Sequence, residues 1–277
     1  MPAKLIDGKK LSEEILAKVG KRVSKLSKKP VLAVVLVGDS PASHLYVEKK
    51  RQVCEKVGVQ SKLYSFCESV SQEEVVAKVK ELNEDNSVNG ILVQLPLPKN
   101  FDRNTVLEAV SPSKDVDGFS AENLGKLALG IETMVSCTAS GIIKMIESTG
   151  TELKGKNCCI VNHSIVVGKP LTMLLLNRNA TVSVCHQFTK NLAEFTKNAD
   201  VLITAAGVPC LIKKEIVKAG SIVIDAGIAK NDGKLCGDVE FDSVKEIVSA
   251  ITPVPGGVGP MTIACLIENT VKAAENQ

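Results

Sequence analysis

A lysine on an otherwise apolar helix face is the strongest candidate for acid–base chemistry in this sequence. The helix is expected over Pro41–Val57, and one of its faces carries Tyr46, Lys50, Val53 and Val57 at helical spacing. A lysine directed at a protein interior loses hydration, so its pKa falls and it can exchange protons near neutral pH. The alternative is a lysine at the rim of the face whose amino group reaches water.

Polar residues at a strand end and in a turn could act together with this lysine. Gln94 stands near the end of a strand expected over Gly90–Leu95, where a parallel sheet exposes its functional edge. Asp115 and Asp117 follow in the turn-like sequence KDVDG, and Asp117 has Gly118 beside it, which permits close approach. A carboxylate there could accept hydrogen bonds from a heterocycle, with turn formation as the alternative role.

A second candidate site follows the strand expected over Asn157–Val161. The turn Asn162–Gly168 leads into a helix, the order that directs backbone N–H groups at a pyrophosphate. Only the last glycine of the Gly-x-Gly-x-x-Gly pattern is present, so an ordinary turn is the alternative. The next strand ends at Cys185–Gln187, without an acidic residue for a ribose 2′-hydroxyl or an arginine for a 2′-phosphate. His163 and Lys190 could supply positive charge, which favours NADP.

Glycine-bearing segments close the remaining strands of this half. Ala205–Pro209 and Asp225–Ile228 each follow a strand, and their small residues would let a nicotinamide ribose approach the backbone. Plain turns are the alternative for either segment alone. The segment Thr252–Thr262 combines three prolines with three glycines before the final helix, whose N-terminus could face a ligand.

Strands and helices alternate along the whole chain, which indicates an α/β fold with parallel sheets. Ser40 and Ser71 are expected to cap the helices that end at Val57 and Glu84, and Thr138 one that ends near Thr149. Further helices are expected over Leu11–Lys28 and Met261–Ala274. Strands are expected over Val31–Val37, Ser61–Phe66, Gly90–Leu95, Asn157–Val161, Thr181–Val184, Val201–Ala205, Ser221–Ala226 and Ser249–Ile251.

Composition limits the class of protein. The net charge of +3 is too small to argue for nucleic acid. Nine cysteines without a C-x-x-C pair suggest neither disulfides nor zinc, and Cys158 and Cys159 are expected in the core. No apolar run is long enough to span a membrane, and the first residues lack the apolar core of a signal peptide, so a cytoplasmic protein without a membrane partner is expected.

The chain resembles the bifunctional methylenetetrahydrofolate dehydrogenase/methenyltetrahydrofolate cyclohydrolase family over nearly its whole length. The matching segments are Val37–Lys50 (VGDSPASHLYVEKK), Gly90–Pro98 (GILVQLPLP), Lys114–Phe119 (KDVDGF), Val166–Pro170 (VVGKP) and Ile251–Thr262 (ITPVPGGVGPMT). The resemblance implies a two-domain α/β protein, with a parallel-type sheet in the substrate domain, a Rossmann-like dinucleotide domain and a cleft between them. The domains implied are a catalytic domain over 1–137, an NAD(P)-binding domain over 138–255, and a loop and helix over 256–277 that return to the first.

The resemblance also implies two reactions and their residues. Methylenetetrahydrofolate would give a hydride to NADP⁺, with NAD⁺ possible, and water would then convert the methenyl cation to 10-formyltetrahydrofolate. Lys50, Tyr46, Gln94 and Asp117 would be catalytic, with Lys50 as the acid/base group and Asp117 on the pterin. The same four residues would bind the folate together with Val93, Leu95, Pro255, Gly256, Gly257, Val258 and Gly259. The dinucleotide would contact Asn162, His163, Ser164, Val167, Gly168, Gln187, Gly207, Ile228 and Thr262. A homodimer is implied, with the sheet edge near Thr181–Val184 as its surface.

The sequence departs from the family pattern mainly on the dinucleotide side. Many members have Pro-Cys-Thr-Pro in place of Ser136–Ala139, Gly-Arg-Ser in place of Asn162–Ser164, and Ser or Arg in place of Gln187. A mainly monofunctional, NAD-preferring enzyme is therefore an alternative. There are two further alternatives. One is another two-domain dehydrogenase, such as one that acts on a shikimate-like acid, and the other is a folate- or nucleotide-binding regulator without catalysis.

Overall fold

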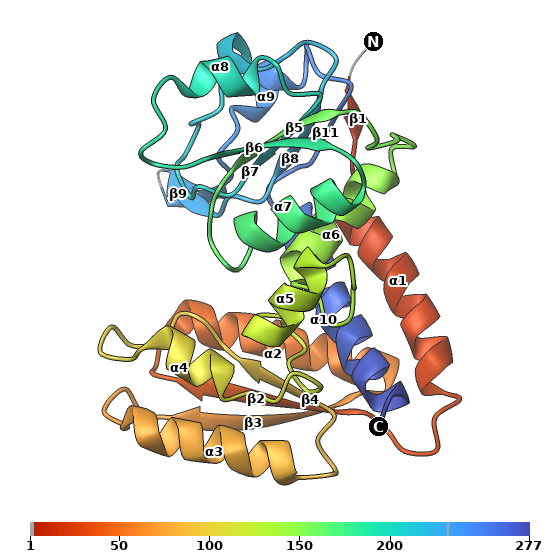
Figure 1. The fold of residues 1–277 in the computed structure, drawn as a ribbon, viewed down its shortest axis with the longest axis vertical. Helices are drawn as coiled ribbons and strands as arrows, with labels where there is room; N and C mark the ends of the chain where they lie inside the picture. Colours follow the sequence, from red (N-terminus) through yellow and green to blue (C-terminus); the bar gives the residue numbers. More distant parts are fainter. Residues whose placement is uncertain (1–2, 232) are drawn as a thin grey trace. The chain divides into compact units, whose positions relative to one another are not determined.

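The computed structural model describes residues 3–231 and 233–277, which form two compact units (Figure 1). Among these residues, the first unit comprises 3–12, 138–231 and 233–262, and the second comprises Glu13–Cys137 and Ile263–Gln277. Each unit has its own parallel sheet and its own hydrophobic core, as expected for a two-domain α/β protein.

The second unit is built on a three-stranded parallel sheet in the order β3-β2-β4. The central strand β2 (Val31–Val37) is buried along its whole length, which explains its unbroken apolar sequence. The edge strand β3 (Gln60–Phe66) is partly exposed, and β4 (Gly90–Val93) is buried. Figure 1 shows α2 (Pro41–Val57) and α3 (Gln72–Glu84) on opposite faces of this sheet. Two shorter helices, α4 (Arg103–Glu108) and α5 (Ala121–Ala128), follow β4.

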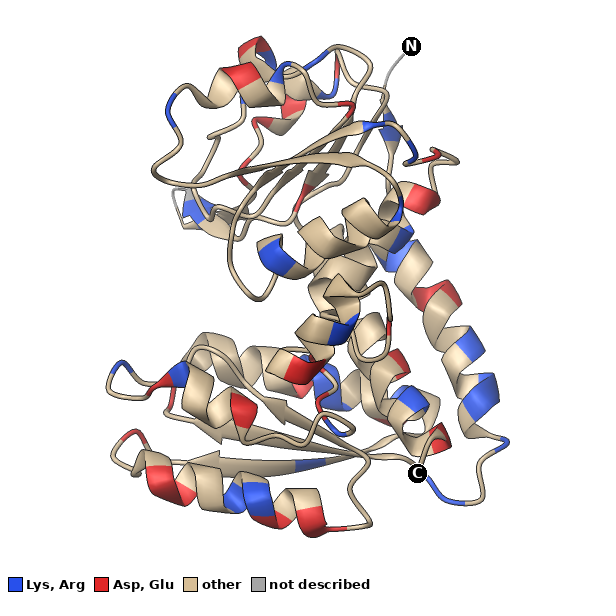
Figure 2. Ribbon diagram, in the orientation of Figure 1, with Lys and Arg blue, Asp and Glu red and all other residues tan. Residues whose placement is uncertain are grey.

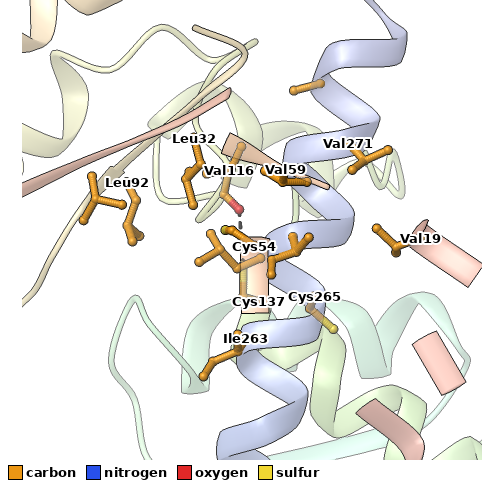
Figure 3. Packing of buried hydrophobic residues seen from close by; sticks show 14 of the residues in the cluster. Val19, Leu32, Cys54, Val59, Leu92, Val116, Cys137, Ile263, Cys265 and Val271 are labelled. Carbon is orange, nitrogen blue, oxygen red and sulfur yellow. Dashed lines mark hydrogen bonds between the residues drawn. The ribbon is translucent and has the colours of Figure 1, made fainter. Parts of the chain in front are cut away.

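The core of the second unit joins segments that are far apart in the sequence. Its buried residues come from the sheet, from α2, from α1 (Gly8–Val23) and from α10 (Val258–Glu275). Figure 3 shows Ile263, Cys265 and Val271 of α10 in this cluster with Cys54 of α2. The C-terminal helix therefore contributes to the support of the helix that carries Lys50.

The first unit is built on a six-stranded parallel sheet in the order β1-β11-β8-β7-β5-β6. The strands are β1 (Lys4–Leu5), β5 (Asn157–Val161), β6 (Thr181–Cys185), β7 (Val201–Thr204), β8 (Ile222–Asp225) and β11 (Ala250–Ile251). In Figure 1, α7 (Gly168–Asn177) lies on one face of the sheet, and α8 (Leu192–Thr196) and α9 (Phe241–Val244) lie on the other. Helix α6 (Cys137–Glu147), the 3-10 turn η1 (Lys214–Ile216) and the hairpin of β9 (Ala229–Asn231) and β10 (Lys234–Cys236) complete the elements.

Several predicted element boundaries are wrong by a few residues. Helix α1 begins at Gly8 rather than Leu11, because Asp7 Oδ1 accepts a hydrogen bond from Lys10 N at 3.0 Å and starts the helix earlier. The helix ends at Val23 rather than Lys28. After Val23 the chain enters a tight turn, in which Leu26 N donates a hydrogen bond to Val23 O. Strand β4 ends at Val93 instead of Leu95.

Two of the three predicted helix caps need correction. Ser71 Oγ accepts from Glu74 N at 3.2 Å, as predicted. Ser40 precedes α2, but its side chain makes no capping hydrogen bond. Helix α6 begins at Cys137, so Thr138 lies inside its first turn, and the Thr138 hydroxyl lies 3.2 Å from that of Thr262.

Charged residues of both signs are interspersed on the helices α1 and α3 (Figure 2). This distribution is typical of solvated helix faces and differs from the one-sided basic stripe of nucleic-acid-binding helices. Among residues 3–231 and 233–277, no helix has the length and apolar character required to cross a membrane. Cys158 and Cys159 lie in the core, as predicted.

Candidate functional site

Lys50 lies on the buried face of α2, with only 6% of its surface exposed. The buried residues of the helix are Ser43, Val47, Lys50 and Cys54, so the centre of the buried face is displaced from the stripe predicted through Tyr46. Burial lowers the pKa of Lys50, and the negative charge of Asp117 opposes this effect. The rim position considered for this lysine is therefore excluded.

Gln94 holds the amino group of Lys50 at the end of β4. Lys50 Nζ donates to Gln94 Oε1 at 3.0 Å, and the Gln94 amide donates to Leu95 O at 2.6 Å. This second bond fixes the side chain so that its oxygen faces Lys50. The backbone N of Gln94 donates to Val35 O at 2.8 Å, which anchors the residue to the central strand. Tyr46, one turn before Lys50, has its ring centre 5.1 Å from Nζ.

The two aspartates of the KDVDG turn have different roles. Asp115 is buried and accepts hydrogen bonds from Gly118 N, Ser120 N and Asn123 Nδ2 at 2.8–3.0 Å, so it forms the turn. Burial raises the pKa of Asp117 to about 6, although the nearby Lys50 ammonium lowers it. Asp117 is therefore the aspartate of this turn whose charge acts on Lys50.

A buried lysine anchors the same turn. Lys114 Nζ donates to the carbonyl oxygens of Leu82, Asn83 and Asp85 at 2.7–3.1 Å, at the C-terminal end of α3. A cation at that position also interacts favourably with the negative end of the helix dipole. Lys114 therefore fixes the turn that carries Asp117 to the body of the unit.

Sequence reasoning missed two residues behind Asp117. Cys137 Sγ donates to Val116 O at 3.2 Å, and Asn269 Nδ2 donates to Val116 O and Val135 O at 2.9 and 3.0 Å. Burial, and then the charge of Asp117, raise the pKa of Cys137 well above its usual value, so the thiol is protonated. Nothing in the local pattern around Asn269 separates it from other helix residues, because its partners are more than a hundred positions away.

In the first unit, Asn162 organises the turn between β5 and α7. Its Oδ1 accepts from Ser164 N at 2.8 Å, Ser164 Oγ at 2.7 Å and Gly168 N at 3.0 Å, while its Nδ2 donates to Ala205 O at 2.7 Å. Val167 N donates to Ser164 Oγ at 3.2 Å. These three backbone N–H groups are thus used inside the turn.

Two glycines of this unit, Gly168 and Gly207, lie where a dinucleotide is expected. A Cβ on Gly168 would lie 2.2 Å from Asn162 O, so only glycine allows this strand-to-helix approach. Gly207 has a φ of 70°, and a Cβ there would lie 3.8 Å from Ile228 O, which places these two predicted residues side by side. At the end of β6, the exposed rings of His163 and His186 lie 4.9 Å apart, next to Gln187.

The glycine-proline loop and Thr262 also belong to the first unit. The loop leads into α10, which begins at Val258, and a Cβ on Gly257 would lie 2.6 Å from Pro253 O. The backbone N of Lys9 donates to Gly256 O at 3.1 Å. The Thr262 hydroxyl donates to Val258 O at 3.2 Å and lies 3.2 Å from the Thr138 hydroxyl, so its hydrogen bonds are within α10 and with α6 rather than at the turn of Asn162.

One unit has a parallel sheet with a glycine-dependent βα turn, and the other has a buried lysine near a carboxyl group. This combination is typical of two-domain α/β proteins that bind a nicotinamide dinucleotide. Residues 6–117 match the tetrahydrofolate dehydrogenase/cyclohydrolase catalytic domain, and residues 136–277 match the NAD(P)-binding domain of the same family. The chain therefore belongs to the tetrahydrofolate dehydrogenase/cyclohydrolase family.

Individual relatives agree with this assignment. The chain is 51% identical to the bifunctional protein FolD of Nautilia profundicola, over 98% of this chain and 97% of that one. A crystal structure of the bifunctional FolD enzyme of Campylobacter jejuni superposes with a TM-score of 0.97 at 46% identity, over 99% of both chains. The Trypanosoma brucei enzyme, described in complex with NADP and an inhibitor, gives 0.95 at 32% identity, over 100% of this chain and 98% of that one.

Proposed function

We propose that this protein oxidises 5,10-methylenetetrahydrofolate to the 5,10-methenyl form with NADP⁺ and hydrolyses that product to 10-formyltetrahydrofolate. The observation that carries the proposal is the buried Lys50, bonded to Gln94 and facing the charge of Asp117, in a chain of this family. The alternatives of a shikimate-like dehydrogenase and a non-catalytic regulator have no such observation in their favour.

Lys50 is assigned the proton transfers of the hydrolytic step. Because burial lowers its pKa, a larger fraction of the amine is neutral near pH 7 than in water. A neutral amine is not repelled by the methenyl cation, and it can accept a proton from the attacking water. Gln94 keeps Lys50 Nζ in place through the 3.0 Å hydrogen bond. The Tyr46 ring, whose centre lies 5.1 Å from Nζ, is assigned to contact the folate.

Asp117 is assigned to the pterin ring. An ionised carboxylate accepts hydrogen bonds from ring N–H and amino groups, and such charge-assisted bonds are about twice as strong as neutral ones. With its pKa near 6, Asp117 is mostly ionised at neutral pH and protonated under mildly acidic conditions. We assign Val93, Leu95 and Pro255–Gly259 to the remaining folate contacts.

NADP, when bound, accepts the hydride of the first step. The residues of the first unit fit a dinucleotide, since Gly168 lets α7 begin against Asn162, just after β5, and the missing Cβ of Gly207 has its nearest neighbour 3.8 Å away. We assign the pyrophosphate to the turn of Asn162–Ser164, with Val167 and Gly168 behind it. The nicotinamide side is assigned to Gly207, Ile228 and Thr262. His163 and Gln187 are assigned to the adenosine end.

We further propose the functional division into 1–137, 138–255 and 256–277, a cytoplasmic location and a homodimer. The dimer surface is the edge strand β6, where Val184 is 39% exposed and the following Phe188 is 76% exposed. Light scattering of the purified protein tests the dimer, and a monomer at micromolar concentration would refute it.

The function is tested by mixing the protein with methylenetetrahydrofolate and either NADP⁺ or NAD⁺ in parallel. NADPH and 10-formyltetrahydrofolate should both accumulate. NADP⁺ should be preferred by more than about tenfold in kcat/KM, which corresponds to about 1.4 kcal/mol. Absence of 10-formyl product with normal NADPH formation would leave a monofunctional dehydrogenase, and a preference for NAD⁺ would refute the cofactor assignment.

A further inference from the structure

Two buried carboxyl groups lie at the carboxyl edge of the six-stranded sheet, and neither belongs to the site assigned above. Asp225 ends β8 and is 3% exposed, and Asp238 follows the hairpin of β9 and β10 and is fully buried. Buried carboxylates are costly unless their oxygens receive hydrogen bonds. Their partners therefore indicate why the fold keeps them.

Asp238 binds the loop that follows β7. One of its oxygens, Oδ2, accepts from Ala206 N at 2.6 Å and from Thr204 Oγ1 at 2.7 Å. The other, Oδ1, accepts from Val208 N at 2.9 Å. The three donors bracket Gly207, so a single side chain fixes the backbone on both sides of this residue.

Asp225 binds the loop that follows β8 and also holds Asp238. Its Oδ1 accepts from Gly227 N at 2.9 Å and from Asp238 N at 3.1 Å, and its Oδ2 accepts from Val239 N at 2.9 Å. The backbone N of Asp225 itself donates to Thr252 Oγ1 at 2.7 Å. The loops after three neighbouring strands, β7, β8 and β11, are therefore connected through these groups.

Glycines make the approach of both carboxyl groups possible. A Cβ on Gly227 would lie 2.2 Å from Asp238 Oδ1, and a Cβ on Gly237 would lie 2.0 Å from Asp225 Oδ2. Contacts shorter than van der Waals distance would force the carboxyl groups away from their donors. The pattern Gly237-Asp238 and the pattern Asp225-Ala226-Gly227 thus form one interlocked arrangement.

The order of the strands shows which part of a dinucleotide this arrangement serves. In the proposed function the pyrophosphate lies at the turn after β5, and β6, on one side of β5, is the strand that would read the adenosine ribose. Strands β7 and β8 lie on the opposite side of β5. Their loops, which carry Gly207 and Ile228, therefore face the nicotinamide half of the ligand.

We infer that Asp238, held by Asp225, is the positioning residue that fixes the nicotinamide-side loops for hydride transfer. The inference rests on the proposed function, because it assumes that NADP binds at this edge. Asp238 does not contact the substrate. It acts through the N–H groups of Ala206 and Val208, and so it should govern the dehydrogenase reaction without governing the affinity for the adenosine half.

The test is the variant Asp238→Asn in the full chain. Its binding of adenosine 2′,5′-bisphosphate, its dehydrogenase kinetics with NADP and its cyclohydrolase activity are measured. An asparagine presents an amide N–H₂ to donors in place of one oxygen, which breaks at least one charge-assisted hydrogen bond. Dehydrogenase kcat/KM for NADP should fall at least about tenfold. The dissociation constant of adenosine 2′,5′-bisphosphate, which has no nicotinamide, should change less than about twofold. Cyclohydrolase activity on methenyltetrahydrofolate, which needs no nucleotide, should remain.

A matched control and a milder pair make the result decisive. Asp200→Asn removes a carboxylate at the other end of the same sheet, where it accepts from Asn157 N and Lys218 Nζ, and it should leave the dehydrogenase unchanged. Thr204→Val removes one donor to Asp238 and should lower dehydrogenase kcat/KM in the same direction, while Thr204→Ser restores it. This pair keeps the test valid if Asp238→Asn does not fold.

Equal loss of bisphosphate binding and dehydrogenase activity in Thr204→Val and Asp238→Asn would overturn the inference, since it would show a general structural role. Unchanged dehydrogenase activity in either folded variant would overturn it as well. Failure of the proposed function is seen separately, as absence of turnover with NADP⁺ in the unaltered protein.

Discussion

Gln94→Glu is expected to hold Lys50 in its charged form and to shut down the hydrolytic reaction at neutral pH. In the structure, the Gln94 oxygen lies 3.0 Å from Nζ. A carboxylate at the same distance would attract the ammonium by about 5 kcal/mol at an effective dielectric constant of about 20, which corresponds to a pKa rise of about four. Desolvation of the new carboxylate offsets part of this, so a rise of about two or more is expected.

The assay is the pH profile of methenyltetrahydrofolate hydrolysis between mildly acidic and alkaline conditions. In the unaltered protein, the rate should rise as Lys50 loses its proton, at a pH below the usual lysine range because burial lowers its pKa. In Gln94→Glu, this rise should move to higher pH, and the rate at pH 7 should fall at least about tenfold.

The matched control is Gln60→Glu, which adds the same charge at an exposed position of β3 and should leave the profile unchanged. A folded, folate-binding Gln94→Glu protein with the profile of the unaltered one would refute the reasoning. It would mean that the titrating group of the hydrolytic step is not Lys50.

Two further substitutions test the other assignments. In Asp117→Asn, the KM for the folate substrate should rise at least about tenfold at pH 7. In the unaltered protein, protonation of Asp117 should raise this KM below about pH 6, and Asp117→Asn should lack that rise. The pKa of Asp117 in the folded protein, about 6, lies above its ordinary value of 3.8. As pH rises between these two values, ionisation of Asp117 should therefore lower the free energy of unfolding by up to about 3 kcal/mol. Denaturant unfolding of Asp117→Asn should lack this pH dependence. Gly168→Ala would place a methyl group 2.2 Å from Asn162 O. A binding titration should therefore show NADP affinity lower by more than about tenfold, while cyclohydrolase activity is retained. Normal NADP affinity would refute the placement of the phosphate turn.

Where local sequence decides the structure, the sequence was sufficient to predict it. Helix α2 has the predicted bounds because Pro41 fits its first position and Gly58, with a φ of 83°, ends it. Strand β2 has the predicted bounds because an apolar run of its length can only be buried on both faces. The short strand β1 was not predicted, since its two residues become a strand only by pairing with β11, far along the chain.

The candidate site shows the same division. Lys50 could be identified from helical spacing, and Gln94 from its place at the end of a strand. The resemblance implied a role for Asp117, but the turn pattern left a turn-forming role open for both aspartates, because the three donors that give Asp115 this role are supplied only by the folded turn. Asp238 had no visible signal either, since the donors to its carboxylate precede it by thirty or more positions.

The central claim is that Lys50 handles the protons of the hydrolytic step, and it is tested most directly by Lys50→Met with both activities measured. Lys49→Met is the control, because the neighbouring lysine is exposed. The account predicts that Lys50→Met folds, binds NADP normally and loses cyclohydrolase activity by at least about a hundredfold, while Lys49→Met keeps both activities. Unchanged hydrolysis of methenyltetrahydrofolate by Lys50→Met would contradict it.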